Sequence, residues 1–169
     1  MLAFELVAQG LIQGSIYALV ALGLTLVYGL LRILHVAHAA LFTLDASTGA
    51  LTPFQIVPSL ADTYTGNSRS SSIAVNQAGT VLYVSNRGED SVAVFAIDAE
   101  SGRLSLVQTQ AAMGRTPRFF TLSPNNRWMY VLNEDSDSIV TMQVNPVNGT
   151  LSPTPNEMRS GSPVCMVFV

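Results

Sequence analysis

Two different patterns of hydrophobic and polar positions follow one another along the chain. Residues 6–31 form one apolar run without a formal charge, whereas residues from 43 onward alternate between short apolar stretches and turn residues. Because roughly 20 apolar residues suffice for a helix to cross the hydrocarbon core of a bilayer, the first pattern predicts an apolar, membrane-spanning α-helix. The second pattern, rich in β-branched and aromatic residues, predicts a series of short β-strands.

The second part of the chain repeats itself. The stretch "LYVSNRGEDSVAVFAID", Leu82–Asp98, recurs 47 residues later as "MYVLNEDSDSIVTMQVN", Met129–Asn145. The turn that follows recurs as well, as "DAESGRL" from Asp98 and "NPVNGTL" from Asn145, with an earlier copy, "DASTGAL", from Asp45. A fixed period of this length, built from short strands and turns, is typical of a β-propeller, in which each repeat forms one four-stranded blade.

The repeat predicts an incomplete propeller. We count two whole units, Ser70–Gln110 and Pro117 to about Pro155, with an outer strand at Leu51–Val57 before them and an opening strand at Val164–Val169 after them. Closed propellers have typically about 4 to 8 blades. The predicted fold class is therefore all-β: a partial β-propeller of about two and a half four-stranded blades, preceded by one apolar, transmembrane α-helix.

The two patterns also predict domains and location. We expect a helical domain over residues 1–42 and the partial propeller over residues 43–169. Arg32 follows the apolar run and Glu5 precedes it, which places the C-terminal side in the cytoplasm. The chain is thus expected to be membrane-associated through residues 6–31, with a cytoplasmic propeller part.

Composition and charge narrow the function classes. The net charge of −3 and the scattered basic residues offer no basic surface for nucleic acid. Cys165 is the single cysteine and sits in an apolar run, which predicts a small buried side chain rather than a disulfide. His35 and His38 would share a helix face, but two ligands without a nearby carboxylate or cysteine do not make a metal site. We expect no metal and no cofactor.

The first part of the chain resembles a transporter family. The stretch "GLIQGSIYALVALGLTLVYGLLRILHVAHAAL" is similar to the N-terminus of the permease subunits of branched-chain amino acid ABC transporters, over about forty residues. It departs from the family's Asn-Phe-Ala-His-Gly segment at His35–Ala39. No second long apolar run follows it, and one helix cannot enclose a transport path.

The second part resembles an enzyme family. The residues that carry this resemblance are "LYVSNRGEDSVAVFAIDAESGRL", "GRTPRFFTLSPNNRWMYVLNEDSDSIVTMQVNPVNGTLSP" and the terminal "SPVCMVFV". They are similar to the C-terminal third of the seven-bladed propeller lactonases, which include one type of bacterial 6-phosphogluconolactonase. The resemblance implies hydrolysis of a phosphorylated or acidic sugar lactone. It also implies that Arg87 and Arg118 match arginines that face the central cleft, with Arg115 as a third candidate for substrate binding.

The resemblance leaves no identified general base. The family's cleft histidine and one of its acidic residues come from earlier blades, and Ser71–Ala74 stands where members usually carry Ala-Glu-Ile-His. No histidine follows His38. The remaining acidic residues of the two hairpin regions lie in turns, where solvation and capping explain them: they are Glu89, Glu134, Asp135 and Asp137. The catalytic residues stay unknown, and we expect little or no lactonase activity from this chain alone.

Three hypotheses follow. The chain is a fragment or fusion of a lactonase-type propeller, a membrane-anchored binding or scaffold module, or a fragment of a permease with the β part as a passenger. The exposed edges of an incomplete propeller also predict self-association, because unpaired strand edges are templates for pairing.

Overall fold

The computed structural model describes residues 38–168, and side chains from Leu41 onward. All regular structure in this part is β, apart from one 3₁₀ turn at Glu134–Ser136. The strands are β1 (His38–Leu44), β2 (Leu51–Pro58), β3 (Arg69–Val75), β4 (Val81–Arg87), β5 (Ser91–Ile97), β6 (Leu104–Ala111), β7 (Pro117–Leu122), β8 (Trp128–Asn133), β9 (Ser138–Val144) and β10 (Leu151–Arg159).

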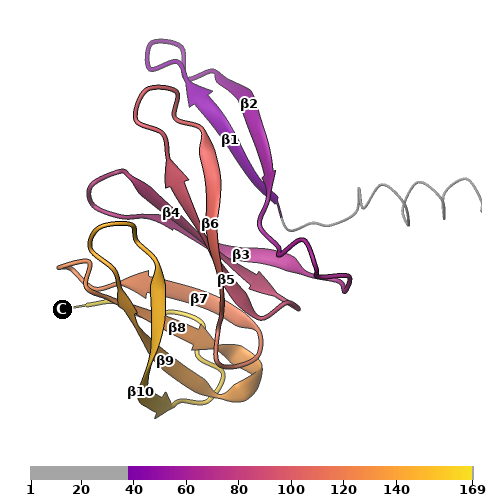
Figure 1. Ribbon diagram of the computed structural model, residues 1–169, viewed down its shortest axis with the longest axis vertical. Helices are drawn as coiled ribbons and strands as arrows, with labels where there is room; N and C mark the ends of the chain where they lie inside the picture. Colours follow the sequence, from indigo (N-terminus) through magenta and orange to yellow (C-terminus); the bar gives the residue numbers. More distant parts are fainter. Residues whose placement is uncertain (1–37, 169) are drawn as a thin grey trace, which may run out of the picture. The chain divides into compact units, whose positions relative to one another are not determined.

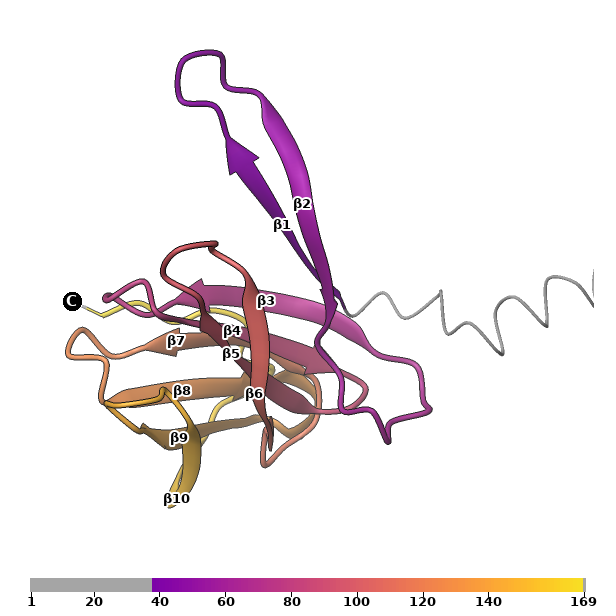
Figure 2. The same ribbon diagram turned by 45° about the horizontal axis from the view of Figure 1, so that its top comes forward.

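The strands form three antiparallel meanders. β3-β4-β5-β6 and β7-β8-β9-β10 are four-stranded sheets, and β1 pairs with β2 as a two-stranded hairpin (Figure 1). Figure 2 shows that the two four-stranded sheets lie side by side, with β3 next to β7. We call β3–β6 the first sheet and β7–β10 the second sheet. Each corresponds to one of the two whole blades that the repeat predicts.

A hydrophobic core joins the two four-stranded sheets. Strand β4 is buried on both faces, and because successive side chains of a strand point to opposite sides, Val81 and Tyr83 face the second sheet while Leu82 and Val84 face the hairpin. The Tyr83 ring meets the edge of the Phe120 ring at a centroid distance of 6.3 Å. The buried residues of this core are Val81, Tyr83, Val92, Val94, Ala112, Phe120, Met129, Val131, Met142, Val144 and Leu151.

Glutamine side chains connect successive sheets at their outer strands. The amide of Gln55 on β2 accepts from the N–H of Leu104 at 2.8 Å and donates to its carbonyl at 3.1 Å. Gln108 on β6 makes the same pair of hydrogen bonds with Leu151 on β10, at 2.7 and 2.9 Å. Each glutamine therefore satisfies both backbone groups of a residue in the next sheet, as a neighbouring strand would do.

The repeated turn has the same backbone construction in all three copies, because the N–H of its glycine donates to the carbonyl of its first residue, and the first two copies share an aspartate that accepts from a serine. In "DASTGAL", Asp45 accepts hydrogen bonds from the N–H and hydroxyl of Ser47, which lowers its pKa to about 2. Asp98 likewise accepts from the N–H and hydroxyl of Ser101, which lowers its pKa. The glycine that ends each turn has a positive φ of 69–73°, which a side chain would strain: these are Gly49, Gly102 and Gly149.

The C-terminal segment differs from the prediction. Residues 164–169 were expected to open a further blade, but the described part, residues 164–168, forms no strand and pairs with no neighbouring strand. The ring of Phe168 instead packs on that of Tyr130 at a centroid distance of 5.7 Å. Cys165, expected to be buried, is exposed.

The structure also corrects the fold class and the location. Residues 38–168 are all-β, and within them no helix is long and apolar enough to cross a membrane. Residues 38–42, placed by the sequence in the helical domain, belong to strand β1. The predicted spanning segment, residues 6–31, lies outside the described residues, as do His35 and most of the permease-like stretch. The fold class is therefore all-β, and neither the preceding helix nor the membrane location that depended on it is kept.

Candidate functional site

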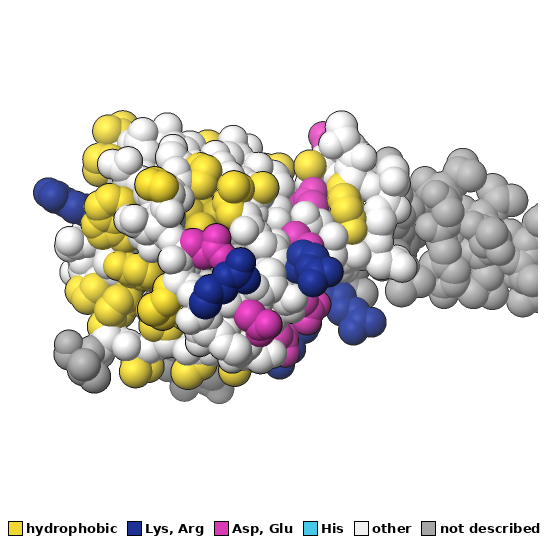
Figure 3. Space-filling view, turned by 90° about the horizontal axis from the view of Figure 1, so that it is seen from below, with side chains coloured by type: hydrophobic (Ala, Val, Ile, Leu, Met, Phe, Trp, Pro, Cys, Tyr) yellow, Lys and Arg dark blue, Asp and Glu magenta, His cyan; other side chains and the backbone are white. Residues whose placement is uncertain are grey.

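The predicted arginines lie at one end of the two four-stranded sheets. β3 and β7 run side by side in the same direction, because Ser71 near the start of β3 donates to the carbonyl of Arg118 near the start of β7 at 2.7 Å, while Gln77 after β3 contacts Asn126 after β7. The starts of β3 and β7 and the ends of β4 and β8 therefore meet at the same end. We call this the arginine end, and Figure 3 shows basic and acidic side chains lying next to one another on one part of the surface.

Arg87 is held closely by the backbone around it. It is the last residue of β4 and half-buried, and its carbonyl accepts a hydrogen bond from the hydroxyl of Ser68 at 3.0 Å. Gly88 follows with a φ of +115°, and its backbone approaches the carbonyl of Asn67 so closely that no side chain would fit. The Nε of Arg87 is buried and has no hydrogen-bond partner among the described residues.

Arg118 is exposed and pairs with a carboxylate. Its Nε lies 3.9 Å from Oε2 of Glu134, with side chains 47% and 30% exposed, so the pair is solvated and contributes little to stability. Arg118 is the second residue of β7, and Glu134 follows the end of β8. This placement leaves the remaining guanidinium nitrogens of Arg118 free of any other ion pair among the described residues.

Arg115 is tied to the neighbouring loop. Its guanidinium Nη2 donates to the carbonyl of Asp135 at 3.1 Å, and its backbone N–H donates to the hydroxyl of Ser136 at 2.9 Å. The structure thus brings Arg87, Arg115 and Arg118 to one end of the sheets. Their guanidinium groups differ in their partners: Arg118 pairs with a carboxylate, Arg115 donates to a carbonyl, and the Nε of Arg87 has no partner among the described residues.

Two carboxylates, which the sequence places in ordinary turns, connect the loops at this end. Glu89 accepts from the N–H of Ala61 at 2.9 Å and from the hydroxyl of Ser91 at 2.6 Å. Asp90 accepts from the N–H of Gly88 at 3.1 Å and from that of Thr116, in the loop before β7, at 2.9 Å. Both carboxylates therefore fix loop geometry.

A tyrosine and a further arginine complete the arginine end. The phenol of Tyr64 donates to the carbonyl of Asn67 at 3.0 Å, and desolvation, followed by the charges of Glu89 and Asp90, raises its pKa. Arg69 begins β3, directly opposite Arg87. Sequence reasoning missed Arg69, and the only signal that could have found it is the register of β3 on β4.

Nothing at the arginine end stands out as a general base. The sequence has no histidine after His38, and Glu89 and Asp90 already accept two hydrogen bonds each from the protein. No group of three metal-ligating side chains occurs within the described residues. The geometry suits binding and orienting an anion, since a guanidinium presents its donors in a planar fork that matches phosphate and carboxylate.

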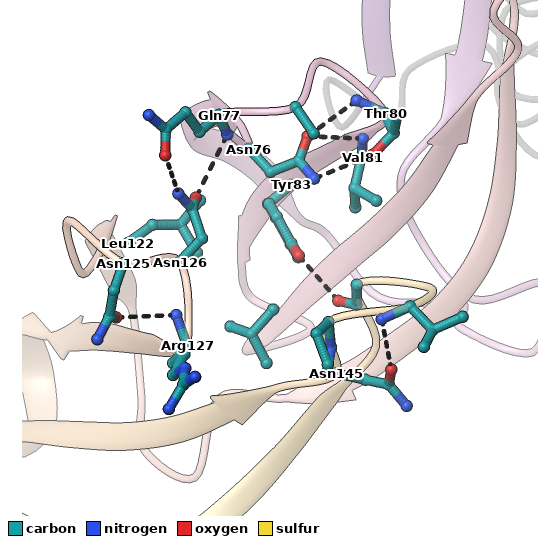
Figure 4. A pocket seen from close by; sticks show the side chains of 15 residues that line it. Asn76, Gln77, Thr80, Val81, Tyr83, Leu122, Asn125, Asn126, Arg127 and Asn145 are labelled. Atoms are coloured by element: carbon teal, nitrogen blue, oxygen red, sulfur yellow. Dashed lines mark hydrogen bonds between the residues drawn. The ribbon is translucent and has the colours of Figure 1, made fainter.

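A cavity of about 490 Å³ lies at the opposite end of the sheets from Arg87, Arg115 and Arg118, and Arg127 is among its lining residues (Figure 4). The turns after β3, β7 and β9 line it, and the phenol of Tyr83 donates to the carbonyl of Gly149 at 2.9 Å within it. Burial raises the pKa of Tyr83 to about 12. The amide oxygens of Asn76, Asn125 and Asn145 accept backbone N–H groups of their own turns, so they stabilise the turns rather than present free groups to a ligand.

Comparison with known proteins places this geometry in one family. Residues 36–168 match the family model described as "Lactonase, 7-bladed beta-propeller". The chain is 33% identical over 125 residues to the 6-phosphogluconolactonase of Bacillus subtilis strain 168, covering 74% of this chain and 36% of the relative.

Solved structures agree. The periplasmic gluconolactonase of Pseudomonas aeruginosa superposes with a TM-score of 0.76 at 28% identity, over 80% of this chain and 37% of that one. A protein from Lactobacillus plantarum superposes with a TM-score of 0.74 at 32% identity, over 77% and 38%. The chain thus spans little more than a third of the length of these relatives. With two blade-like sheets in the same meander order and a family match over most of its length, the chain belongs to the seven-bladed β-propeller lactonase family.

Proposed function

We propose that the two described sheets form the substrate-binding arc of a lactonase-type propeller, and that the arginine end holds a phosphorylated or acidic sugar lactone such as 6-phosphogluconolactone. The observation that carries this proposal is the gathering of Arg87, Arg115 and Arg118 at the end where β3 and β7 begin. Guanidinium groups suit both the anionic group of such a lactone and the oxyanion that forms when its ester carbonyl is attacked.

The reaction would be hydrolysis of the ring ester. A water molecule attacks the carbonyl carbon, the bond between that carbon and the ring oxygen breaks, and a carboxylate, a hydroxyl group and one proton are released. A general base normally accelerates the attack by water. The carboxylates at the arginine end accept hydrogen bonds from the protein or pair with Arg118, and no imidazole is available after His38. The chain alone is therefore proposed to bind the lactone without hydrolysing it at an enzymatic rate.

Binding of the ring-opened product tests the proposal. Calorimetric titration of the full chain with 6-phosphogluconate and with gluconate should give measurable binding for the first and weaker binding for the second. Arg118→Gln should weaken 6-phosphogluconate binding severalfold, whereas Arg127→Gln, an exposed arginine at the cavity end, should leave it unchanged. Equal binding by Arg118→Gln and the wild-type chain would contradict the role of Arg118.

A binding or scaffold module is the second candidate, without a membrane anchor. It is favoured by the absence of an identified base together with a 490 Å³ cavity away from Arg87, Arg115 and Arg118. Its edge strands would also support the self-association that the sequence predicts. Sedimentation of the full chain over a concentration series tests the self-association, and a monomer at every concentration would contradict it. The fusion and the permease-fragment hypotheses depend on residues 1–42 and stay predictions.

A further inference from the structure

Two like charges face each other across the first pair of strands of the first sheet. Arg69, the first residue of β3, is the direct register partner of Arg87, the last residue of β4. Side chains of directly opposite residues lie on the same face of a sheet, with Cβ atoms about 4.5–5.5 Å apart, and like charges at such positions destabilise the sheet. The fold therefore places two arginines, the exposed Arg69 and the half-buried Arg87, at directly opposite positions on one face of the sheet.

The alternation of β4 shows toward which side these groups project. Val81 and Tyr83 pack into the core between the two four-stranded sheets, and Arg87 has the same parity along the strand. Arg87 and its partner Arg69 therefore project toward the second sheet, where Arg118 is the second residue of β7. The two arginines belong to the arginine end.

The structure shows no ion pair at either arginine of this pair among the described residues. Within the described residues, ion pairs form at Arg118 and at Arg159, and none forms at Arg69 or Arg87. The buried Nε of Arg87 has no acceptor. A buried charged donor without an acceptor is costly, so its retention points to an acceptor that comes from outside the described chain.

The two carboxylates that follow Arg87 along the chain are held in place by other groups. Glu89 is occupied by the N–H of Ala61 and the hydroxyl of Ser91, and Asp90 by the N–H groups of Gly88 and Thr116. These bonds fix both acids to the loops. Rotation of either acid toward the arginine pair would break two hydrogen bonds, so a diffusible anion is the better partner.

We propose that Arg69 and Arg87 form a two-armed subsite for a phosphate group, with Arg69 as a specificity-determining residue. This inference deepens the proposed function. It rests on that function only in taking the phosphate to be part of a sugar lactone. Two guanidinium forks on one face can donate to different oxygens of one dianion, and its charge removes the repulsion between them. Arg118, which already pairs with Glu134, would then contact the lactone carbonyl of the substrate rather than its phosphate.

Inorganic phosphate alone is the probe that tests this subsite. In the full chain, we expect phosphate to raise the unfolding temperature and to shift the amide NMR signals of Ser68, Arg69 and Gly88, because a ligand that binds the folded state stabilises it. Arg69→Gln should weaken phosphate binding about tenfold, as expected when a charge-assisted hydrogen bond is lost. Without phosphate, Arg69→Gln should unfold at the same or a higher temperature, because the like-charge pair is gone.

Matched variants separate the subsite from general attraction of anions. Arg69→Lys should bind phosphate with intermediate affinity, since it keeps the charge but loses the fork, and Arg127→Gln should bind as the wild-type chain does. Unchanged phosphate binding in Arg69→Gln, an equal loss in Arg127→Gln, or no binding to the wild-type chain would each overturn the subsite. If phosphate binds through Arg69 and 6-phosphogluconate does not compete with it, the subsite stands and the proposed function fails.

Discussion

Asn86 and Asn133 occupy the same position at the ends of β4 and β8, yet only Asn86 has both ends of its amide hydrogen-bonded. Asn86 donates to the carbonyl of Ser59 at 2.6 Å and accepts from the hydroxyl of Ser59 at 2.7 Å. Asn133 donates to the carbonyl of Ala112 at 3.1 Å, but its Oδ1 is buried without a partner in the described structure. Ala112 stands where the first sheet has Ser59, whose hydroxyl is the closer of the two donors to Oδ1 of Asn86, the other being that of Ser70 at 3.5 Å.

The missing hydroxyl leads to a stabilising substitution. Ala112→Ser should place a donor beside Oδ1 of Asn133 and raise the free energy of unfolding by about 1 kcal/mol, the usual net value of a hydrogen bond. Chemical denaturation measures the change. The matched control is Ser59→Ala, which removes the donor from Asn86 and should cost about 1–3 kcal/mol. A loss of stability in Ala112→Ser would show that the site has no room for the hydroxyl.

The glutamine connections between sheets give a second prediction. Gln108→Leu leaves both backbone groups of the buried Leu151 without their side-chain partner and should lower the free energy of unfolding by about 1–3 kcal/mol. Gln143→Leu is the control, because Gln143 is an exposed position of β9 and should change stability by less than about 0.5 kcal/mol. Equal effects of the two substitutions would mean that the connection carries no stability.

Two glycines with the same backbone conformation allow the cost of backbone strain to be measured separately from the cost of disturbed packing. Gly49 and Gly149 have φ of 72° and 73°, but a Cβ at Gly49 meets nothing within 4 Å, whereas at Gly149 it meets Val81 and the phenol oxygen of Tyr83 within 2.8 Å. Gly49→Ala should therefore cost about 1–2 kcal/mol of backbone strain alone. Gly149→Ala should cost more, measured by urea denaturation, because it also disturbs the core. Similar losses in both variants would argue against tight packing around Tyr83.

The raised pKa of Tyr83 predicts a loss of stability in alkaline solution. Burial keeps the phenol protonated in the folded chain up to about pH 12, whereas in the unfolded chain it ionises near pH 10. The stabilisation by the neutral phenol is thus complete below about pH 10 and is lost as the pH rises toward 12, by up to about 3 kcal/mol.

A tyrosine-to-phenylalanine variant isolates this effect. All eight basic residues are arginines, which stay charged in this range. Tyr83→Phe should be less stable at neutral pH, because the carbonyl of Gly149 loses its donor. Its free energy of unfolding should fall less steeply between pH 10 and 12 than that of the wild-type chain. Parallel pH profiles for the two chains would mean that Tyr83 does not titrate as described.

The repeat predicted the two sheets well because strand period and turn chemistry are local properties. The two copies "LYVSNRGEDSVAVFAID" and "MYVLNEDSDSIVTMQVN", which lie 47 residues apart, form the β4–β5 and β8–β9 hairpins with their turns. Pattern alone failed at residues 164–168, because an apolar stretch forms a strand only when its backbone groups pair with a neighbouring strand. It failed again at His38–Phe42, where an apolar stretch suits a helix and a strand equally.

The site could be predicted only in part. Arg87 and Arg118 could be predicted because the sequence resembles a family whose matching arginines face the central cleft, and in the structure both lie at the arginine end. Arg69 carries no such signal, since its importance depends on the register that sets it opposite Arg87. The buried, unpartnered Nε of Arg87 depends on how the loop at Gly88 closes against Asn67, which no residue pattern specifies.

The rate of lactone hydrolysis tests most directly whether this chain binds its substrate without turning it over. Hydrolysis of 6-phosphogluconolactone by the full chain should be followed beside the spontaneous reaction and beside the Bacillus subtilis 6-phosphogluconolactonase. We predict a rate equal to the spontaneous one at concentrations where 6-phosphogluconate binds. Turnover comparable to that of the Bacillus subtilis enzyme would contradict the account, because it would require a general base among residues that the structure shows engaged elsewhere.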